Sequence, residues 1–304
     1  MKSVPKICAV ILNTNRREDT LACLQSLKNN QYPNLHIIVL DNASTDGSYE
    51  AIQTAYPQVQ QVSLTENKGY AGNNNVGIAL AMEAQADWIF VLNEDIILAP
   101  DAFSQLMAVV QDLPQVGIIG PLVYHYDEPT IIQSAGGILS ERWDSSHRGL
   151  NESDHGQYNQ PQEVQWISGC AIGVRRSAVE QAGMIDERFF YYWEETEWCL
   201  RIRSFGWQAF VIPQAKIWHK GVQRDYQPNP NVTYYSTRNR LLLYSKHHPS
   251  LRIWLSTGLF FLRTLLSWSL KPRWQNKRQH RDALWQGLTD FLKKRWGIRP
   301  VKQG

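Results

Sequence analysis

Short apolar runs alternate with longer amphipathic stretches over the first third of the chain. The apolar runs are typical of strands, and the stretches between them carry apolar residues at helical spacing. We predict strands at Ile7–Leu12, His36–Leu40, Val59–Leu64 and Trp88–Leu92, with helices at about 19–29, 48–56 and 71–84. This alternation of strand and helix predicts an α/β fold with a mostly parallel, Rossmann-like sheet and right-handed crossovers.

Beyond residue 115 the pattern changes to shorter strands with glycine breaks. We predict strands at Val116–Ile119, Ile131–Leu139, Val164–Val174, Ala209–Ile212 and Lys216–Trp218, and a helix at Glu194–Phe205. These strands predict a small antiparallel extension of the sheet. The polar residues 141–162 predict a long surface loop.

A third region begins near residue 230. Ile253–Leu270 is eighteen residues long and contains one charged residue, Arg263. As a helix it would span about 27 Å, just short of a bilayer core, and a charge near its middle is costly in a spanning helix. We therefore predict a helix that lies at a membrane surface. The alternatives are a helix packed on the main domain or in a homodimer, and a true span.

The charges of the chain are unevenly distributed. Its 304 residues, 43% of them apolar, allow one large domain with an appendage. Residues 271–304 contain ten lysines or arginines against two aspartates, whereas the net charge of the whole chain is only +3. We predict a main domain at 1–228 and a basic, helical C-terminal appendage at 229–304 that meets an anionic membrane surface. We expect no nucleic-acid partner, because no nucleic-acid-binding motif is recognisable.

The four cysteines lie far apart and form no CxxC pair. This spacing predicts buried thiols in a reducing compartment. The N-terminal residues run directly into the first predicted strand without a recognisable signal peptide. Together these features predict a cytoplasmic location, at the inner face of the cell membrane.

Polar residues follow three of the predicted parallel strands, at Asn13–Arg16, Asp41–Ser44 and Asn93–Asp95. In open α/β sheets the carboxyl ends of such strands share one edge, where ligands bind. Asn93, Glu94 and Asp95 come directly after a run of five apolar residues, and burying charge there is unfavourable unless it is paired or bound to a metal. We predict a hard-cation site in which Asp95 also faces phosphate oxygens, with a solvated turn as the alternative.

A second acidic cluster lies between aromatic residues at 191–198. Glu194 and Glu197 are three residues apart and would share a helix face, whereas Glu195 points elsewhere. Aromatic neighbours exclude water and raise the pKa of a carboxyl toward the range of a general base. The alternative is an acidic helix N-terminus stabilised by the helix dipole.

Two further features are weaker signals. The loop Asn67–Gly77 is rich in glycine and asparagine and leads into a helix whose N-terminus suits a diphosphate, but it matches neither the dinucleotide fingerprint nor a P-loop. His219 follows an apolar strand, where it is either a structural histidine or a partner of a metal or diphosphate.

Taken together, these motifs resemble family 2 glycosyltransferases with the nucleotide-sugar-binding GT-A fold, and within that family the rhamnosyltransferase-like branch. The resemblance covers about residues 5–245. It rests on an ordered set of segments: 10–16, 39–48, 67–77, 93–95, 169–171, 189–201 and 234–239.

The resemblance assigns roles to individual residues. Asp95 is expected to bind Mn²⁺ or Mg²⁺, with His219 as a second metal candidate. Asp41 and Asn13 are expected to hold the base, and Glu195 is expected to be the catalytic base, with Glu194 as the other candidate. The remaining substrate-binding candidates are Asn15, Lys68, Gly69, Asn75, Asn93, Glu94, Gly169, Trp193 and Glu197.

Two departures from the family pattern matter. The chain has Glu194-Glu195 where the family usually has Glu-Asp, and Glu94 where the branch often has Pro or Asp. Neither change removes a carboxylate. The Gln-x-x-Arg-Trp element of processive synthases is absent, because Leu292 stands three residues before Arg295.

The resemblance therefore implies an inverting, metal-dependent, non-processive transferase. It would move a sugar, with rhamnose from a thymidine diphosphate donor favoured, to a glycan or lipid-linked acceptor in polysaccharide or cell-envelope biosynthesis. Two alternatives stay open. A sugar nucleotidyltransferase would want a glycine-rich loop after the first strand, and Asn13–Arg16 has no glycine. A non-catalytic module that binds nucleotide sugars is the other.

Overall fold

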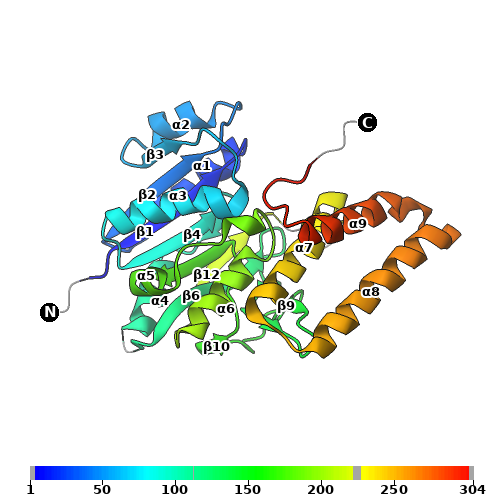
Figure 1. Cartoon of the computed structure of the whole chain (residues 1–304). Coiled ribbons are helices and arrows are strands. Elements are labelled where there is room, and N and C mark those ends of the chain that lie inside the picture. The colour runs from blue at the N-terminus through cyan, green and yellow to red at the C-terminus, as the bar shows by residue number, and fades with distance from the viewer. Residues whose placement is uncertain (1–3, 112, 222–226, 301–304) are drawn as a thin grey trace.

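The structure is a computed structural model that describes residues 4–111, 113–221 and 227–300 (Figure 1). The strands are β1 (Ile7–Asn13), β2 (Leu35–Asp41), β3 (Gln60–Ser63), β4 (Trp88–Asn93), β5 (Ile96–Leu98), β6 (Val116–His125), β7 (Ile132–Ser134), β8 (Gly137–Leu139), β9 (Ser145–His147), β10 (Gln162–Val164), β11 (Ala171–Arg175) and β12 (Gln208–His219). The helices are α1 (Arg17–Lys28), α2 (Ser48–Ala55), α3 (Gly69–Glu83), α4 (Ala102–Val110), α5 (Arg176–Ala182), α6 (Glu194–Ser204), α7 (Pro230–His247), α8 (Leu251–Leu270) and α9 (Arg278–Leu292). Short 3₁₀ turns occur at η1 (Glu187–Phe189) and η2 (Pro272–Lys277).

Ten of the described strands form one sheet. Its main order is β10-β12-β6-β11-β4-β1-β2-β3, with β5 paired to β12 and β7 paired to β6. β3, β2, β1 and β4 are parallel, and β11 runs antiparallel to both of its neighbours. The predicted mostly parallel sheet with an antiparallel extension is confirmed.

The central strands are apolar throughout because helices cover both faces of the sheet. In β4, Trp88 and Phe90 pack into the core shared with α1, α2 and α4, whereas Ile89 and Val91 pack into the core shared with α3, α5 and α6. β1 alternates in the same way. A strand buried on both faces carries apolar side chains at every position. Polar side chains are therefore found where the strands end.

Several predicted strands have different bounds. The predicted strand Ile131–Leu139 is two strands, β7 and β8, because Gly136 between them adopts a left-handed φ of +85°. Val164–Val174 is likewise divided into β10 and β11 by an irregular segment. In contrast, the two strands predicted within 209–218 are one, β12, whose register against β6 shifts between Ile212 and Lys216. Within the predicted surface loop 141–162, β9 pairs with β8.

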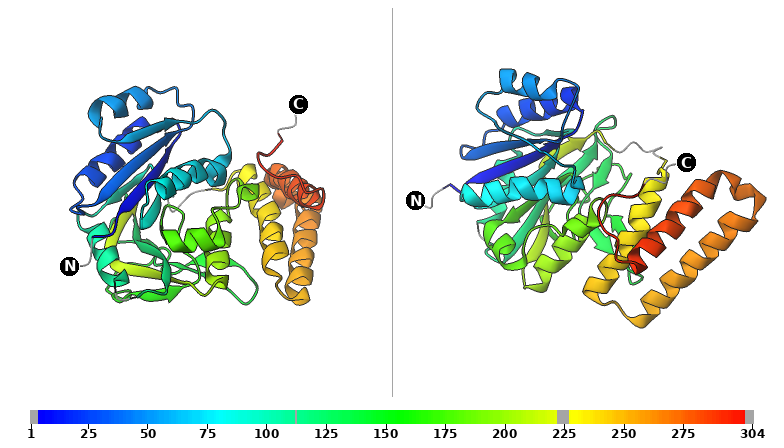
Figure 2. Two further views of the ribbon diagram at one scale, coloured as in Figure 1. Left: turned by 60° about the vertical axis from the view of Figure 1, so that its left-hand side comes forward. Right: turned by 45° about the horizontal axis from the view of Figure 1, so that its top comes forward.

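The C-terminal helices stand beside the sheet, with α7 nearest to it and α8 on the far side (Figures 1 and 2). α9 packs on α7, and α8 packs on α9. Within the described residues, α8 is the helix long and apolar enough to cross a membrane by length and composition, and it buries only Ile253, Thr257 and Phe261. The division at residues 228 and 229 stays a prediction, and Lys302 of the basic tail lies outside the described residues.

Candidate active site

The loops that follow β1, β2 and β4 meet the N-termini of α3 and α6 around one cavity of about 530 Å³. Eight of the predicted site residues line it: Gly69, Asn93, Glu94, Asp95, Gly169, Glu194, Glu195 and His219. A larger cavity, of about 880 Å³, lies among the C-terminal helices and has no acidic residue in its wall. The smaller cavity therefore holds the candidate acid–base residues Glu194 and Glu195.

Asp95 and His219 form a close pair in this cavity. His219 ends β12, which pairs with β5 directly after Asp95, so the sheet brings the two residues together. Asp95 Oδ1 lies 3.1 Å from His219 Nε2. The other ring nitrogen, Nδ1, lies 2.8 Å from Gln133 Oε1, which can only accept a hydrogen bond. In a neutral ring Nε2 therefore carries a lone pair, and it faces a carboxylate oxygen.

This pair fits a divalent cation. Asp95 Oδ1 is buried and has no hydrogen-bond donor. Two ligands at about 2.1 Å from an octahedral cation and at right angles lie about 3 Å apart, which is close to the observed separation. A Cβ atom on Gly221 would lie 2.6 Å from Asp95 Oδ2, so glycine leaves the space beside the pair open. No cluster of three or more acidic, histidine or cysteine ligands occurs in the described ranges, so water and substrate oxygens would have to supply the other ligands of a cation.

The charge around Asp95 is balanced by an arginine. Arg16 Nη2 lies 3.4 Å from Asp95 Oδ2, and its Nε lies 3.9 Å from Glu94 Oε1. Burial alone would raise the pKa of Asp95, but His219 in its protonated form and the Arg16 guanidinium hold it below its ordinary value. Burial and the neighbouring Asp95 instead raise the pKa of Glu94 to about 7. Arg16 was not among the predicted site residues, although it follows β1 at the same edge as Asp95.

Glu194 and Glu195 are the first two residues of α6, and both line the cavity. Glu194 is buried, and its Oε2 has no hydrogen-bond partner. Burial, reinforced by Glu195, raises the pKa of Glu194 well above its ordinary value. Burial also raises the pKa of Glu195. The pair therefore holds one proton more readily than exposed glutamates do.

The loop before these glutamates is strained and is held by α7. Phe190, Tyr192 and Trp193 all have left-handed φ angles, between 63° and 73°, a conformation that is unfavourable for such side chains. The Asn239 side-chain amide donates to the carbonyl oxygens of Phe189, Tyr191 and Tyr192 at 2.7–2.8 Å. Because α7 supplies these donors, the C-terminal region shapes the active-site loop.

Arg238 supports the same loop from beneath. It is fully buried, and its Nη2 donates to the carbonyl oxygens of Phe189 and Arg188 at 3.0 and 3.2 Å. Its Nη1 donates to the carbonyl oxygen of Gly297 at 2.8 Å. Arg238 thus joins the active-site loop to the end of the described chain. Neither Arg238 nor Asn239 was singled out as a site residue by the sequence, which indicated only the branch-like segment that contains them.

Glu197 faces away from the cavity. Its carboxylate is fully buried and meets Arg201 at 3.0 Å, Lys246 at 2.8 Å and His247 at 3.5 Å. Burial opposes ionisation, but His247, Arg201 and Lys246 together lower the pKa of Glu197 to about 2. Lys246 also pairs with Asp186, so the cluster fastens α6 to α7.

Asn13, Asn15 and Asp41 lie outside the cavity wall. Asn13 Nδ2 donates to Asp41 Oδ1 at 2.9 Å, and Asp41 Oδ2 accepts from the backbone of Ser44 at 3.1 Å. Asn15 Oδ1 accepts from the backbone of Thr45 at 2.7 Å. These side chains fix the loop after β2, which presents Asn42 to the cavity. Their predicted contact with the base stays a prediction.

Of the predicted site residues near α3, one lines the cavity and the others lie outside its wall. Gly69 lines the cavity and has a φ of +71°, and a Cβ there would lie 2.3 Å from the Phe190 carbonyl oxygen. Lys68 is exposed and lies outside the wall. Asn75 is buried and binds the backbone of Ile185 through both ends of its amide, at 2.8 and 3.0 Å. Trp193 lines the larger cavity instead.

Two wall residues had no signal in the sequence. Tyr70 donates a 2.6 Å hydrogen bond to the carbonyl oxygen of Gly169 and fixes the segment before β11. His147 comes from the predicted surface loop and lies 2.9 Å from Ser134 Oγ. Burial lowers the pKa of His147 to about 4, so it is neutral at pH 7. Because His147 stands among polar residues, the sequence did not reveal that its segment folds back onto the cavity.

Comparison with known proteins agrees with this geometry. The sequence profile of glycosyl transferase family 2 matches residues 8–183. The chain is 28% identical over 201 residues to an N-acetylglucosaminyl-diphospho-decaprenol L-rhamnosyltransferase of Mycobacterium tuberculosis, covering 60% of this chain and 66% of that relative. It is 25% identical over 295 residues to the dTDP-rhamnosyl transferase RfbF of Shigella flexneri, covering 93% of this chain and 95% of that relative. The chain thus spans just under two thirds of the first relative.

Solved structures share the fold at low sequence identity. The mannosyltransferase PcManGT from Pyrobaculum calidifontis, in complex with GDP-Man and Mn²⁺, matches with a TM-score of 0.59 and 14% identity, over 96% of this chain and 88% of that one. GalNAc-T7 with UDP, GalNAc and Mn²⁺ matches with a TM-score of 0.62 and 13% identity, over 81% and 48%. The predicted GT-A fold is confirmed, and the chain belongs to glycosyl transferase family 2, a family of glycosyltransferase enzymes.

Proposed function

We propose that this enzyme transfers a sugar from a nucleoside-diphosphate sugar to an acceptor hydroxyl, with inversion at the anomeric carbon. One observation carries the proposal. A single cavity holds a buried carboxylate–imidazole pair, Asp95 with His219, and a pair of glutamates with raised pKa, Glu194 and Glu195. The first pair suits a divalent cation and the second suits proton removal.

Asp95 and His219 would hold Mn²⁺ or Mg²⁺ against the donor diphosphate. When bound, the cation supplies positive charge that stabilises the departing nucleoside diphosphate. The N-terminus of α3, which begins at Gly69 on the cavity wall, adds backbone N–H groups suited to the same phosphates. Arg16 balances the carboxylate charge of Asp95 on the other side.

Glu195 would act as the base. Its carboxylate takes the proton of the acceptor hydroxyl while the acceptor oxygen forms a bond to the anomeric carbon. The bond from that carbon to the diphosphate oxygen breaks, and the nucleoside diphosphate leaves with its electron pair. A single displacement of this kind inverts the anomeric centre. The raised pKa of Glu194 beside it disfavours a second negative charge in the pair.

The relatives suggest the substrates. Names of two relatives refer to rhamnose, one as dTDP-rhamnosyl transferase and one with an N-acetylglucosaminyl-diphospho-decaprenol acceptor. We therefore favour dTDP-rhamnose as donor and a polyprenyl-diphosphate-linked sugar as acceptor, in cell-envelope glycan synthesis. The exposed apolar face of α8 supports a peripheral position at the inner surface of the membrane.

A donor screen tests the proposal. The full chain is heated with Mn²⁺ and each of a set of UDP-, GDP- and dTDP-sugars, and the melting temperature is recorded. A ligand at a hundred times its Kd stabilises the folded state by about 2.7 kcal/mol. We expect dTDP-rhamnose to raise the melting temperature with Mn²⁺ and much less with EDTA. A chain that no nucleotide sugar stabilises, with either Mn²⁺ or Mg²⁺, would contradict the proposal.

A further inference from the structure

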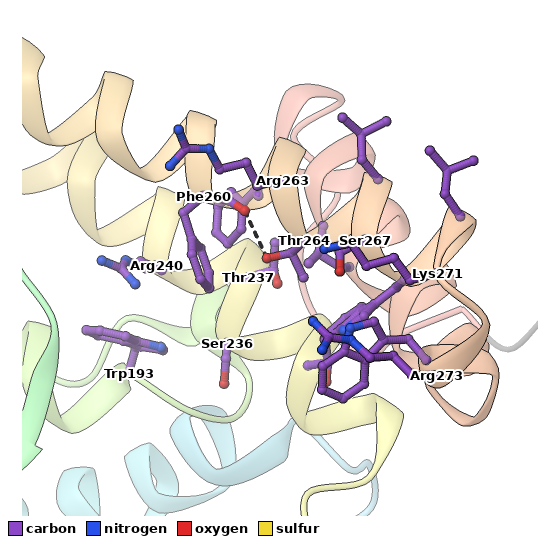
Figure 3. A pocket seen from close by; sticks show the side chains of 17 residues that line it. Trp193, Ser236, Thr237, Arg240, Phe260, Arg263, Thr264, Ser267, Lys271 and Arg273 are labelled. Atoms are coloured by element: carbon purple, nitrogen blue, oxygen red, sulfur yellow. Dashed lines mark hydrogen bonds between the residues drawn. The ribbon is translucent and has the colours of Figure 1, made fainter.

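The larger cavity is a groove between α7 and α8 that ends at η2 (Figure 3). Its volume is about 880 Å³. Aromatic and aliphatic side chains form most of its apolar surface: Phe260, Phe261, Leu266, Trp268, Leu270 and Trp274. Phe260 and Leu266 are 57% and 50% exposed, so their apolar surfaces are open to a ligand.

The polar groups of the groove are cationic. Arg240, Arg263, Lys271 and Arg273 contribute to its wall, and no aspartate or glutamate does. Arg240 pairs with Asp144 at 2.7 Å. Arg263 and Lys271 have no acidic partner in the described part of the chain, and Arg273 makes only a cation–π contact with Trp274 there. An apolar trough with unneutralised cations is complementary to an amphiphile that carries a phosphate group.

The groove and the candidate active site share the loop that contains Trp193. This residue lines the groove, while its chain neighbours Tyr192 and Glu194 line the catalytic cavity. In Figure 3, Trp193 and Arg240 lie at one end of the groove, and Lys271 and Arg273 lie toward the other. A molecule that spanned both cavities would pass Trp193 and meet Arg240.

We propose that this groove binds the isoprenoid chain and diphosphate of a lipid-linked acceptor and presents the acceptor sugar to Glu195. The inference rests on the proposed function and names the part of the chain that recognises the acceptor. The apolar chain lies on Phe260 and Leu266, and the diphosphate meets Arg263 in the same wall.

Charge favours this occupant over a second copy of the protein. A symmetric dimer through the groove would bring the same cations of both copies together, with no acid in either wall to offset them. A flat membrane surface would contact the whole outer face of α8, including Leu262, which lies outside the groove wall and is 52% exposed. The groove and the membrane surface therefore predict different effects for two leucines of the same helix.

The test measures binding of a fluorescent geranylgeranyl diphosphate to the full chain in detergent. We expect Leu266→Ser and Arg263→Gln each to weaken binding by roughly tenfold. The matched controls are Leu262→Ser and Arg252→Gln, since both residues are exposed on α8 and outside the groove wall. We expect the controls to bind as the wild type does. Inorganic diphosphate should compete weakly, because it lacks the chain.

Three results would overturn the inference. Equal weakening by Leu266→Ser and Leu262→Ser, seen also with vesicles of phosphatidylcholine and phosphatidylglycerol, would assign the face to the membrane surface. A dimer that Leu266→Ser dissociates, without binding of the probe, would assign it to a second copy. If inorganic diphosphate competed as strongly as the unlabelled lipid does, the apolar wall would not contribute to binding.

The design separates this inference from the proposed function. Should the chain bind no nucleotide sugar, none of them would raise its melting temperature, yet binding of the isoprenyl probe would still report on the groove. Should only the groove be wrong, nucleotide sugars would stabilise wild type and Leu266→Ser equally, and the probe would not distinguish the groove variants from their controls.

Discussion

Glu195 and Glu197 lie two residues apart in the first turn of α6, and their surroundings are opposite. Glu197 faces Arg201, Lys246 and His247, and its pKa falls to about 2. Glu195 lines the substrate cavity beside Glu194, and burial raises its pKa. Burial is common to both, so the difference comes from the groups that each carboxylate faces. A structural acid is neutralised by the protein, whereas the candidate base is left for the substrate.

The strongest test of the difference between Glu195 and Glu197 is to remove the charge of the candidate base, Glu195. Glu195→Gln should lower turnover by about 10²–10⁴-fold, because no carboxylate remains to accept the proton of the acceptor hydroxyl. Nucleotide binding and melting temperature should stay close to those of the wild type. The release of nucleoside diphosphate measures turnover. Near-normal turnover in this variant would move the base to Glu194.

The pH profile of turnover adds to that test. Since the pKa of Glu195 is raised, the base becomes protonated as pH falls through a midpoint above the ordinary value of 4.5. Turnover in the wild type should therefore decline on the acid side while nucleotide binding persists. Glu195→Gln should lose that acid limb, and an unchanged limb would show that another group titrates.

The converse substitution should affect stability and not chemistry. Glu197→Gln takes the buried carboxylate away from Arg201 and Lys246, of which Lys246 keeps Asp186 as a partner. Breaking a buried pair costs about 3–5 kcal/mol. Urea unfolding should show a lower midpoint, while the turnover of the remaining folded enzyme changes little. A large loss of turnover with unchanged stability would place Glu197 in the catalytic machinery after all.

Asn239 tests how far the loop before α6 positions the two glutamates. Asn239→Ala removes a donor group shared by three loop carbonyls and should lower the free energy of unfolding by about 1–3 kcal/mol. It should also lower kcat more than it raises the KM of the nucleotide sugar, since the loop places the glutamates. Asn231→Ala, at the exposed start of the same helix, is the matched control and should change neither.

The smallest effect concerns acid stability. The folded-state pKa of Glu197 is lowered from 4.5 to about 2, so its contribution to stability is complete above pH 4.5 and is lost as pH falls toward 2. The stability difference between wild type and Glu197→Gln should therefore shrink over this window. Chemical denaturation at several pH values measures the difference. A difference that does not vary with pH would mean that packing, and not charge, stabilises the cluster.

The fold could be predicted largely because its signals are local. Five apolar residues at 88–92 require burial on both faces, and such a strand belongs at the centre of a parallel sheet. The same rule placed polar residues at one edge, and it brought Asp95 into the cavity wall. Where glycine turns interrupt a strand, as at Gly136, the bounds were wrong because apolar content alone does not reveal a left-handed backbone.

The rest of the site depends on contacts between distant residues. Spacing along α6 suggested that Glu197 shares a face with Glu194, but it did not reveal that Lys246 from α7 neutralises that position. Likewise, Asn13 and Asp41 each follow a strand at the correct edge, yet they bond to each other at 2.9 Å. A sequence pattern shows which edge a polar side chain occupies, but not whether another side chain already binds it.

The strained loop at 190–193 has a consequence for the order of events during synthesis. The chain emerges from the ribosome N-terminus first, so the sheet and both active-site glutamates are complete before Asn239 is made. Until that amide arrives, the three left-handed residues lack the donors that hold them. An unfinished or C-terminally clipped chain would thus have the fold without the aligned base. Because α7 is made after the sheet, the loop that aligns Glu195 can take its final conformation only after α7 has packed against it.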